Sequence, residues 1–156
     1  MNIRRANEED IPRLDDLLYQ VHRVHSTGRP DIFRVGNKKY TDDGLRVILA
    51  SDETPVFVAE NVDGLVVGYA FCVVQQVKGE KSLMDRKTLY IDDLCVDENQ
   101  RRKGIGEALY RFVLEESRRL ACDAVTLNVW YGNDALKFYE KCGMKPQKIG
   151  MEYILC

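Results

Sequence analysis

The feature that most constrains this fold is a hairpin signal in the first half of the chain. The pair Asp63-Gly64 separates an apolar run at 56–60 from a long run at 65–77 that is rich in β-branched and aromatic residues. An Asp-Gly pair between two such runs is typical of a tight turn joining antiparallel strands. After a polar loop, residues 87–96 form another apolar run. The sequence therefore predicts three consecutive antiparallel strands.

The remaining segments alternate between helix and strand patterns. We expect strands at 2–6, at 124–129 and within 144–154, and helices at about 7–28, 41–50, 104–120 and 133–142. Asn7 is the expected N-cap of the first helix, and Thr41 or Asp42 that of the second. Strands joined by tight turns, followed by strands alternating with helices, predict a mixed α/β (α+β) sheet in a single domain spanning 1–156.

Composition excludes several classes of function. The 156 residues include 23 Lys and Arg and 25 Asp and Glu, so the net charge is −2 and the chain lacks the basic surface that general nucleic-acid binding needs. No apolar run approaches the roughly 18 residues of a membrane helix, and the start MNIRRANEED lacks the apolar core of a secretory signal. We therefore expect a cytoplasmic protein with no membrane or nucleic-acid partner.

Cysteine and histidine usage argues against disulfides and metal. The cysteines are Cys72, Cys95, Cys122, Cys142 and Cys156. They are odd in number, widely spaced and without a CxxC pair, which favours free thiols in a reducing compartment. His22 and His25 have no nearby cysteine or carboxylate at ligand spacing, so they make a weak metal site. The sequence predicts no metal.

A basic, glycine-containing segment lies between a strand pattern and an amphipathic helix. It reads Arg101-Arg102-Lys103-Gly104-Ile105-Gly106. Unpaired N–H groups at a helix N-terminus, together with glycines that allow close approach, make an anion site suited to a pyrophosphate. The segment is neither a P-loop nor a GxGxxG fingerprint. The alternative is a solvated basic turn, but two glycines here cost roughly 0.5–1 kcal/mol each relative to alanine and need a reason.

Three side chains are candidates for acid–base chemistry. Asp92 and Asp93 interrupt the strand pattern at 87–96, and in a regular strand their side chains would point to opposite faces. A carboxylate without a partner there would have a raised pKa and could act as a base, whereas the alternative is a structural salt bridge. Tyr139 follows Asn133, the expected cap of its helix, and its ordinary interpretation is a buried aromatic.

Together these segments resemble the GNAT superfamily of N-acetyltransferases, which transfer the acetyl group of acetyl-CoA to an amine. The strand at 91–97, followed by 101–106, is similar to the family's (R/Q)xxGxG/A acetyl-CoA motif. The segment 133–139, followed by Gly143-Met144, is similar to its NxxAxxxYxxxGF motif. The resemblance implies a mixed, mostly antiparallel twisted sheet of six to seven strands flanked by about four helices.

The resemblance also implies a role for each matching residue. The backbone of Leu94, Cys95 and Val96 would pair with the pantetheine arm, and one N–H there would polarise the thioester carbonyl. The pyrophosphate would lie against Arg101, Arg102, Lys103, Gly104, Ile105 and Gly106. Asn133 would contact the pantetheine, and Tyr139 would protonate the departing thiolate.

The base and the acceptor are less strongly specified. Asp92 best matches the family's catalytic acid, often a glutamate, and its shorter side chain favours a water relay. The acceptor would lie near Asp31, Phe33, Tyr40 and Asp92, which either form an acidic, aromatic pocket for an amine of a small molecule or peptide or are scattered surface and core residues. Family members are often homodimers. The competing hypothesis is a binding module of the same fold that senses acyl-CoA without turnover and does not need both Tyr139 and Asp92.

Overall fold

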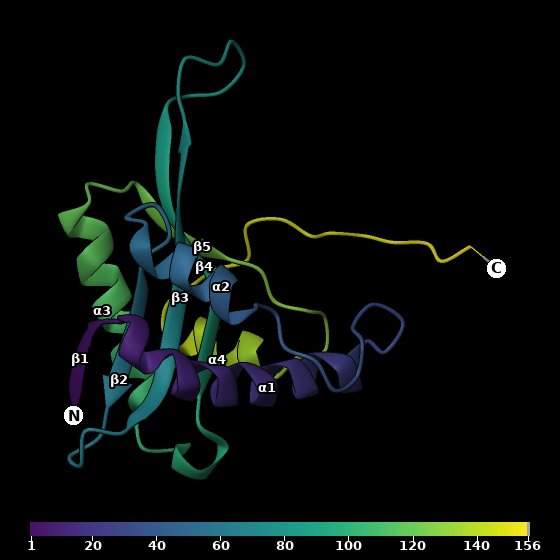
Figure 1. Cartoon of the computed structure of the whole chain (residues 1–156). Coiled ribbons are helices and arrows are strands. Elements are labelled where there is room, and N and C mark those ends of the chain that lie inside the picture. Colours follow the sequence, from purple (N-terminus) through teal and green to yellow (C-terminus); the bar gives the residue numbers. More distant parts are fainter. Residues whose placement is uncertain (156) are drawn as a thin grey trace.

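Five strands form one sheet at the centre of the computed structural model, which describes residues 1–155 (Figure 1). The strands are β1 (Asn2–Arg5), β2 (Val56–Glu60), β3 (Val66–Val77), β4 (Arg86–Val96) and β5 (Ala124–Leu127). They lie side by side in chain order, the first four antiparallel and β5 parallel to β4. The predicted mixed, mostly antiparallel sheet is confirmed, with fewer strands than expected.

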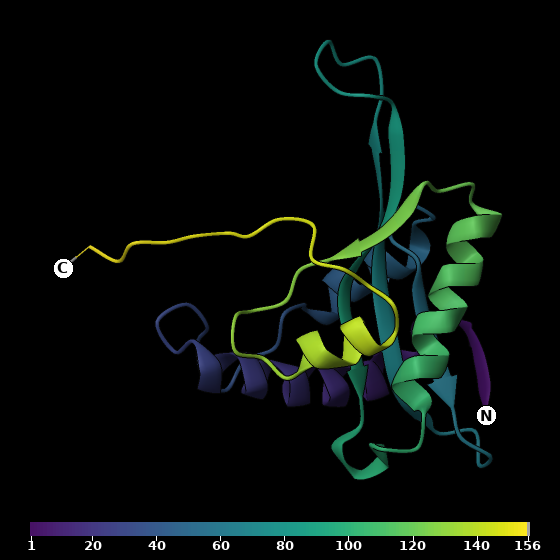
Figure 2. The ribbon, with the colours of Figure 1, turned by 180° about the vertical axis from the view of Figure 1, so that it is seen from behind.

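Helices cover both faces of the sheet (Figures 1 and 2). They are α1 (Ile11–Gly28), α2 (Asp42–Ala50), α3 (Ile105–Arg119) and α4 (Ala135–Lys141), with short 3₁₀ turns at Glu8–Asp10 and Glu98–Gln100. The first two helices pack on one face, and α3 and α4 pack on the other. Within residues 1–155, no helix combines the length and apolar character needed to cross a membrane.

The alternation of side chains along β3 divides the core between these two faces. Tyr69 and Phe71 join a buried cluster with the leucines of α1, whereas Ala70 and Cys72 join a cluster with α3. Because successive side chains of a strand point to opposite faces, β3 supplies both halves of the core. The core on both faces of the sheet holds β3 and the neighbouring strand β4 in place. This matters because β4 carries the candidate catalytic carboxylates.

Asn7 caps the short 3₁₀ turn that precedes α1 and not α1 itself, whose N-cap is Asp10, whereas Thr41 caps α2 as expected. The side chain of Asn7 accepts a backbone N–H of the next turn, and the Asp10 carboxylate accepts the Asn7 N–H at 2.9 Å, which forms a capping box. The Thr41 hydroxyl accepts the Gly44 N–H at 3.0 Å. Thr41, rather than Asp42, is therefore the N-cap of α2.

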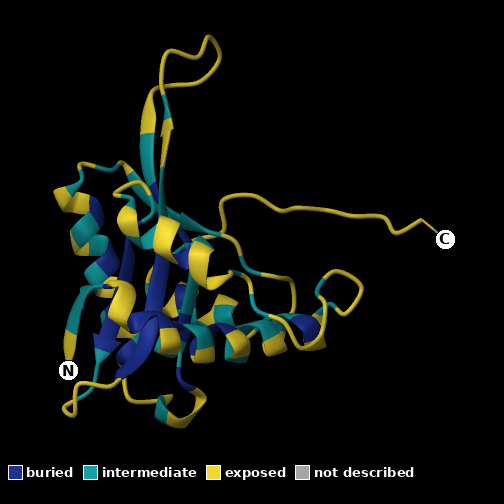
Figure 3. Cartoon of the chain, in the orientation of Figure 1, coloured by how far each residue is buried: buried dark blue, intermediate teal, exposed yellow. Residues whose placement is uncertain are grey.

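The strand expected within 144–154 does not form. Residues 145–155, here named the C-terminal arm, have no regular secondary structure, pair with no strand of the described chain and are exposed along their length (Figures 1 and 3). The residue pattern of 144–154 indicates that the segment can be extended, but it does not indicate whether a sheet edge lies beside it. The sheet therefore has five strands instead of six to seven. Cys156, and the predictions that concern it, lie outside the described residues.

Candidate functional site

The site lies where β4 and β5 diverge. The two strands pair only from Thr88 with Ala124 to Ile91 with Leu127. Beyond Ile91, β4 continues to Val96 and remains paired with β3 on its other side. The edge of β4 at 92–96 therefore faces no strand of the described chain, and Figure 2 shows β5 leaving β4 there. An open strand edge has backbone N–H and C=O groups available for a ligand in an extended conformation.

A β-bulge lies at the start of this open edge. Phe71 of β3 is opposite Asp93, and the next residue, Cys72, is opposite Ile91. Asp92 is thus the extra residue of the bulge and has no partner across the ladder. An extra residue shifts the alternation of side chains by one position. The prediction that Asp92 and Asp93 point to opposite faces is therefore wrong, because it assumed a regular strand.

Hydrogen bonds to both carboxylates come from the same side of the sheet. The Asp92 carboxylate accepts a hydrogen bond from the Lys39 ammonium at 2.5 Å and another from the Tyr40 hydroxyl at 2.7 Å. Asp93 accepts the hydroxyl of Tyr69 at 2.8 Å. The rings of both tyrosines pack against one phenylalanine of β3, which lies on the face covered by α1 and α2. Asp92 therefore forms a salt bridge, with Lys39 as its partner, which is the alternative that the sequence analysis gave for the two aspartates.

Burial raises the pKa of Asp93 to about 6. The negative charge of Asp92 acts in the same direction, while the Tyr69 hydroxyl and the Lys39 ammonium lower the pKa. A carboxylate with this pKa is ionised at neutral pH yet accepts a proton more readily than an ordinary aspartate. These are the properties of a general base.

Tyr139 lies buried in α4, in the core cluster on the face opposite the carboxylates. Burial and then the charge of Asp93 raise the pKa of the Tyr139 hydroxyl. Its ring packs edge-on against Tyr110 of α3. The phenol therefore keeps its proton at neutral pH and lies within electrostatic reach of Asp93. The difference between the pKa of Tyr139 and that of an ordinary thiol is therefore larger than the difference between their unperturbed pKa values.

The segment that follows β4 turns sharply before α3 begins. The Asp97 carboxylate caps a 3₁₀ turn by accepting the Asn99 N–H at 3.0 Å and forms an ion pair with Arg13 of α1. Arg102 (φ 65°) and Gly104 (φ 75°) both have left-handed backbone. Glycine adopts this conformation freely, whereas a residue with a β-carbon does so at a cost. The left-handed backbone of Arg102 therefore costs conformational free energy, which the fold offsets when this loop forms.

Backbone N–H groups of the first turn of α3 stay available at the end of the loop. Gly104 is the N-cap and has no side chain to bond them. Arg101, Arg102 and Lys103 are exposed immediately before it. A β-carbon at Gly106 would lie 3.4 Å from the Phe138 ring and 3.6 Å from Val96. The N-terminus of α3 therefore lies between the end of β4 and α4. The region bounded by the open edge of β4, the glycine loop and α4 is called the gap below.

The other predicted site residues also border this gap. Leu94 packs with the core under α3, while the Cys95 thiol points the other way and donates to the Leu17 carbonyl of α1 at 3.7 Å. Burial raises the pKa of the Cys95 thiol to about 12, so only its backbone is available for chemistry. Asn133 accepts the Ala135 N–H at 2.9 Å, but the N-cap of α4 is Asp134, one residue later than predicted.

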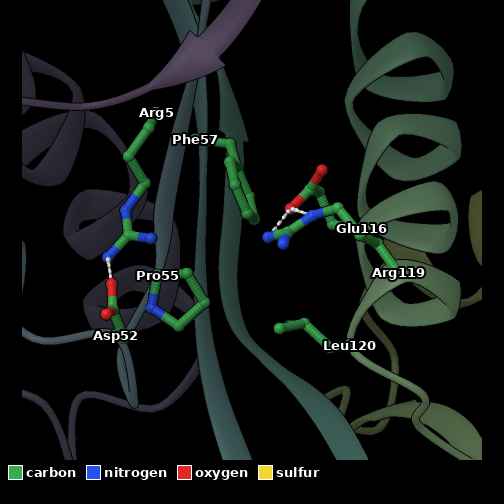
Figure 4. A pocket seen from close by; sticks show the side chains of 7 residues that line it. All are labelled: Arg5, Asp52, Pro55, Phe57, Glu116, Arg119 and Leu120. Carbon is green, nitrogen blue, oxygen red and sulfur yellow. Dashed lines mark hydrogen bonds and ion pairs between the residues drawn. The ribbon is translucent and has the colours of Figure 1, made fainter.

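A cleft runs beside the loop, on the side of α1. Its volume is about 330 Å³, and it is lined by Gln20, Arg23, Val24, Thr27, Glu98 and Arg101. A second pocket of about 220 Å³ lies between β1, β2 and the C-terminal end of α3 (Figure 4). There Arg5 pairs with Asp52 and Arg119 pairs with Glu116. Because α3 is about 22 Å long, this second pocket is remote from the glycine loop.

Two loops meet beyond the carboxylates in an aromatic cluster. The ring of Phe33 lies 5.2 Å from that of His25 and 5.6 Å from that of Trp130. The guanidinium of Arg29 lies 5.5 Å over the Trp130 ring. The loop after α1 and the loop after β5 are thus joined by aromatic contacts. Burial lowers the pKa of His25, and the charges of His22 and then Lys39 act in the same direction, so the cluster lies near Lys39.

The predicted acceptor pocket is brought together only in part. Tyr40 and Asp92 are in contact, and Phe33 lies in the aromatic cluster. Asp31 instead forms an ion pair with Arg29 at 2.7 Å. Sequence reasoning missed Lys39, Tyr69 and Trp130. The spacing of Tyr69 and Phe71 on one face of a strand could have pointed to Tyr69, but nothing in the sequence pairs Lys39 with a residue 53 positions away.

Comparisons with known proteins point to one family. A family model described as "Acetyltransferase (GNAT) family" matches residues 18–144. An uncharacterized N-acetyltransferase of Methanocaldococcus jannaschii is 25% identical over 148 residues, which are 94% of this chain and 62% of that protein. A glucosamine 6-phosphate N-acetyltransferase of Arabidopsis thaliana is 34% identical over 65 residues, 42% of each chain. The chain thus spans less than two thirds of the length of either relative.

Solved structures with the same fold cover most or all of the chain. A mutant form of a Bacillus halodurans protein is 32% identical over 100% of both chains, with a TM-score of 0.95. An acetyltransferase from Vibrio fischeri is 25% identical over 83% of this chain and 97% of its own, with a TM-score of 0.68. An aminoglycoside N-acetyltransferase in complex with CoA, 16% identical, covers 99% of this chain and 100% of its own with a TM-score of 0.72 and shares the fold.

Proposed function

This chain belongs to the GNAT acetyltransferase family, and on that premise we propose that it transfers the acetyl group of acetyl-CoA to a primary amine of a small molecule or peptide. One observation carries the proposal. The open edge of β4 at 92–96 leads directly into the glycine loop and the N-terminus of α3, with carboxylates on one side and Tyr139 on the other. A thioester donor and an amine acceptor could therefore meet in one gap.

The donor fits the groups that border the gap. An extended pantetheine chain can pair with the backbone of Leu94, Cys95 and Val96, as an added strand would. Its pyrophosphate suits the loop 101–106, which combines available N–H groups with exposed cations. One backbone N–H of this edge would polarise the thioester carbonyl. Asn133, which lies just before α4, would contact the pantetheine.

The chemistry follows from the side chains around the thioester. Asp92, directly or through a water molecule, takes a proton from the acceptor ammonium, and the half-buried Asp93 adds negative potential beside it. The neutral amine then attacks the thioester carbon, a C–N bond forms and the C–S bond breaks, while the nitrogen loses its second proton to solvent and becomes the amide N–H. Tyr139 donates a hydrogen bond and then its proton to the departing sulfur, and it regains a proton from solvent.

The acceptor in this proposal is a cationic amine. Lys39 already places an ammonium 2.5 Å from Asp92, so the carboxylate can hold such a group, and the acceptor would displace Lys39. The aromatic wall of Phe33 and Trp130 suits the carbon skeleton beside a cation. Relatives named for glucosamine 6-phosphate and aminoglycosides act on amines, which supports this class. We propose a cytoplasmic enzyme, consistent with free thiols at Cys72, Cys95, Cys122 and Cys142.

The test separates binding from turnover. Acetyl-CoA at about 100 times its Kd should raise the free energy of unfolding by roughly 2.7 kcal/mol, a Tm increase of about 5–10 °C, whereas ATP and NAD should not. Release of CoA, measured by chromatography with a panel of primary amines, should then identify acceptors. No thermal shift would overturn the donor site. A shift without CoA release for any amine would favour the binding module that senses acyl-CoA.

A further inference from the structure

The side-chain amine of Lys39 occupies the position that the proposed reaction gives to an acceptor. Lys39 lies in the loop between α1 and α2, and its ammonium donates to the Asp92 carboxylate at 2.5 Å. Its charge also reaches Asp93, whose pKa is raised by burial and lowered in part by the Lys39 ammonium. The chain's own lysine is therefore already in contact with the proposed base.

The preceding residue fixes the end of this loop. The Lys38 ammonium donates to Asp15 of α1 at 2.5 Å and to Asp42 of α2 at 2.8 Å, and its side chain is only 16% exposed. Hydrogen bonds between charged groups are among the strongest in proteins, so the loop is tied to both helices at Lys38. The two neighbouring lysines thus have different partners, and only Lys39 contacts Asp92.

The following residue guides the Lys39 side chain. The ring of Tyr40 stacks on that of Phe71 in β3, with 5.5 Å between the ring centres, and its hydroxyl donates to Asp92 at 2.7 Å. The Lys39 ammonium lies 5.4 Å from the centre of the Tyr40 ring, which is within reach of a cation–π contact. A carboxylate and an aromatic ring therefore hold the ammonium, while 45% of the side chain stays exposed.

Asp92 also lies beside the place proposed for the donor. It is the extra residue of the bulge at the start of the open edge of β4, and that edge continues through residues 93–96. The proposed function pairs the pantetheine of acetyl-CoA with this edge, so an amine on Asp92 shares the gap with the thioester. Holding two reactants together makes their reaction effectively unimolecular and can accelerate it by several orders of magnitude.

We propose that the chain acetylates its own Lys39 side chain when acetyl-CoA is bound and no other amine is present. This inference rests on the proposed function. Asp92 takes one proton from the Lys39 ammonium, the neutral amine attacks the thioester carbon, a C–N bond forms and the C–S bond breaks. The nitrogen loses its second proton to solvent, and Tyr139 protonates the departing sulfur and regains a proton from solvent. The products are Nε-acetyl-lysine and CoA.

The modification changes the site that produces it. Acetylation removes the positive charge of a lysine and its ability to form a salt bridge, so acetylated Lys39 no longer pairs with Asp92. The carboxylate is then left for the ammonium of an external acceptor. The reaction also stops by itself, because each chain has one Lys39 and its acetylated form has no amine left to react.

Mass spectrometry of the full chain tests the proposal. A lysine deacetylase first removes any acetyl group acquired during expression, and the protein is then incubated with saturating acetyl-CoA that carries a ¹³C-labelled acetyl group. Lys39 should gain one labelled acetyl group at least about 10²-fold faster than Lys38 or the exposed Lys148, because only Lys39 contacts the base. The rate per chain should stay constant on dilution of the protein, since the reaction occurs within one chain. Equal labelling of all three lysines, or a rate that falls on dilution, would overturn the proposal.

Two variants show whether the chain's own chemistry adds the label. Lys39→Arg keeps a cation beside Asp92 but cannot form acetyl-lysine, so the rapid labelling of the chain should disappear. Tyr139→Phe should label Lys39 about 10²-fold more slowly than wild type, because it lacks the proposed acid. Equal rates in Tyr139→Phe and wild type would show chemical acetylation by the thioester alone and would refute self-acetylation.

Thermal shift and CoA release distinguish failure of this inference from failure of the proposed function. If acetyl-CoA raises the Tm and an added amine releases CoA, yet Lys39 stays unlabelled without that amine, self-acetylation is wrong and the proposed function stands. If acetyl-CoA causes no thermal shift and Lys39 stays unlabelled, both proposals fail. A thermal shift with rapid labelling confined to Lys39 supports both.

Discussion

Asp92 and Asp93 are adjacent in β4 and yet lie on the same face of the sheet, because the bulge opposite Phe71 shifts the alternation by one residue. Their charges therefore add. Asp92 is compensated by Lys39, whereas Asp93 is half-buried and desolvation raises its pKa to about 6. The bulge thus forms a proton-accepting site at the open edge of β4.

Replacing Tyr139 with phenylalanine tests the proton donor. Tyr139→Phe should lower kcat by about 10²-fold or more, the usual contribution of a general acid, and leave the Kd for acetyl-CoA unchanged. Tyr110→Phe is the matched control, since Tyr110 packs edge-on against Tyr139 in the same core. Steady-state kinetics and calorimetry measure the two quantities. Unchanged kcat in Tyr139→Phe, or an equal loss in both variants, would remove Tyr139 from the mechanism.

Asp92→Asn tests the base. The amide cannot accept the ammonium proton, so kcat/KM for the amine should fall by about 10²-fold, while acetyl-CoA binding should stay within twofold. Asp31→Asn provides the comparison, because Asp31 is an ion-paired aspartate of the neighbouring loop that does not contact Asp92. Equal kinetics for Asp92→Asn and wild type would show that another group takes the proton.

The raised pKa of Asp93 predicts a pH-dependent stability. The pKa is about 6 in the folded protein and about 3.8 without the fold. Between these values the folded state binds more protons, so the free energy of unfolding falls as pH rises from about 4 to 6 and stays lower at neutral pH. Asp93→Asn should therefore be more stable than wild type at pH 7.5, by on the order of 1–3 kcal/mol.

Denaturant titrations at pH 4 and pH 7.5 measure this difference. It should shrink at pH 4, where wild-type Asp93 is already protonated in the fold. Asp63→Asn, in the exposed turn between β2 and β3, controls for the loss of one charge. A stability gain in Asp93→Asn that is equal at both pH values would contradict the titration of Asp93.

Gly106→Ala separates the anion site from the fold. The added β-carbon would meet Phe138 and Val96 at ordinary contact distances, so the protein should stay folded with a Tm within a few degrees of wild type. The Kd for acetyl-CoA should nevertheless rise about tenfold or more, because the methyl group prevents close approach to the helix N-terminus. Gly28→Ala, whose added methyl group would meet no atom within 4 Å, should bind normally. Equal affinities would exclude Gly106 from the donor site.

Local signals predicted much of this architecture because they depend on neighbouring residues. Thr41 caps α2 and the Asp63-Gly64 pair joins β2 to β3 as predicted, while Asn7 caps the 3₁₀ turn just before α1. The glycine loop likewise lies between β4 and α3. In each case the chemistry that forms the structure lies within a few residues of sequence.

Features that depend on distant partners were not predictable in the same way. The bulge at Asp92 reflects the register between β3 and β4, and one extra residue leaves no mark in an apolar pattern. The pairing of Lys39 with Asp92 joins residues from a loop and a strand. The arm at 145–155 has the pattern of a strand, but that pattern does not show that the arm lies away from the open edge of β5.

The divergence of β4 from β5 also has a thermodynamic consequence. β5 pairs with β4 through only four residue pairs, and the α4 segment that follows is held to the sheet by packing against the core under α3. A ligand in the gap would contact both the sheet and α4. By linkage, the free energy with which such a ligand stabilises the packing of α4 equals the free energy with which packed α4 stabilises the bound ligand. Substitutions that loosen α4 are therefore expected to weaken cofactor binding.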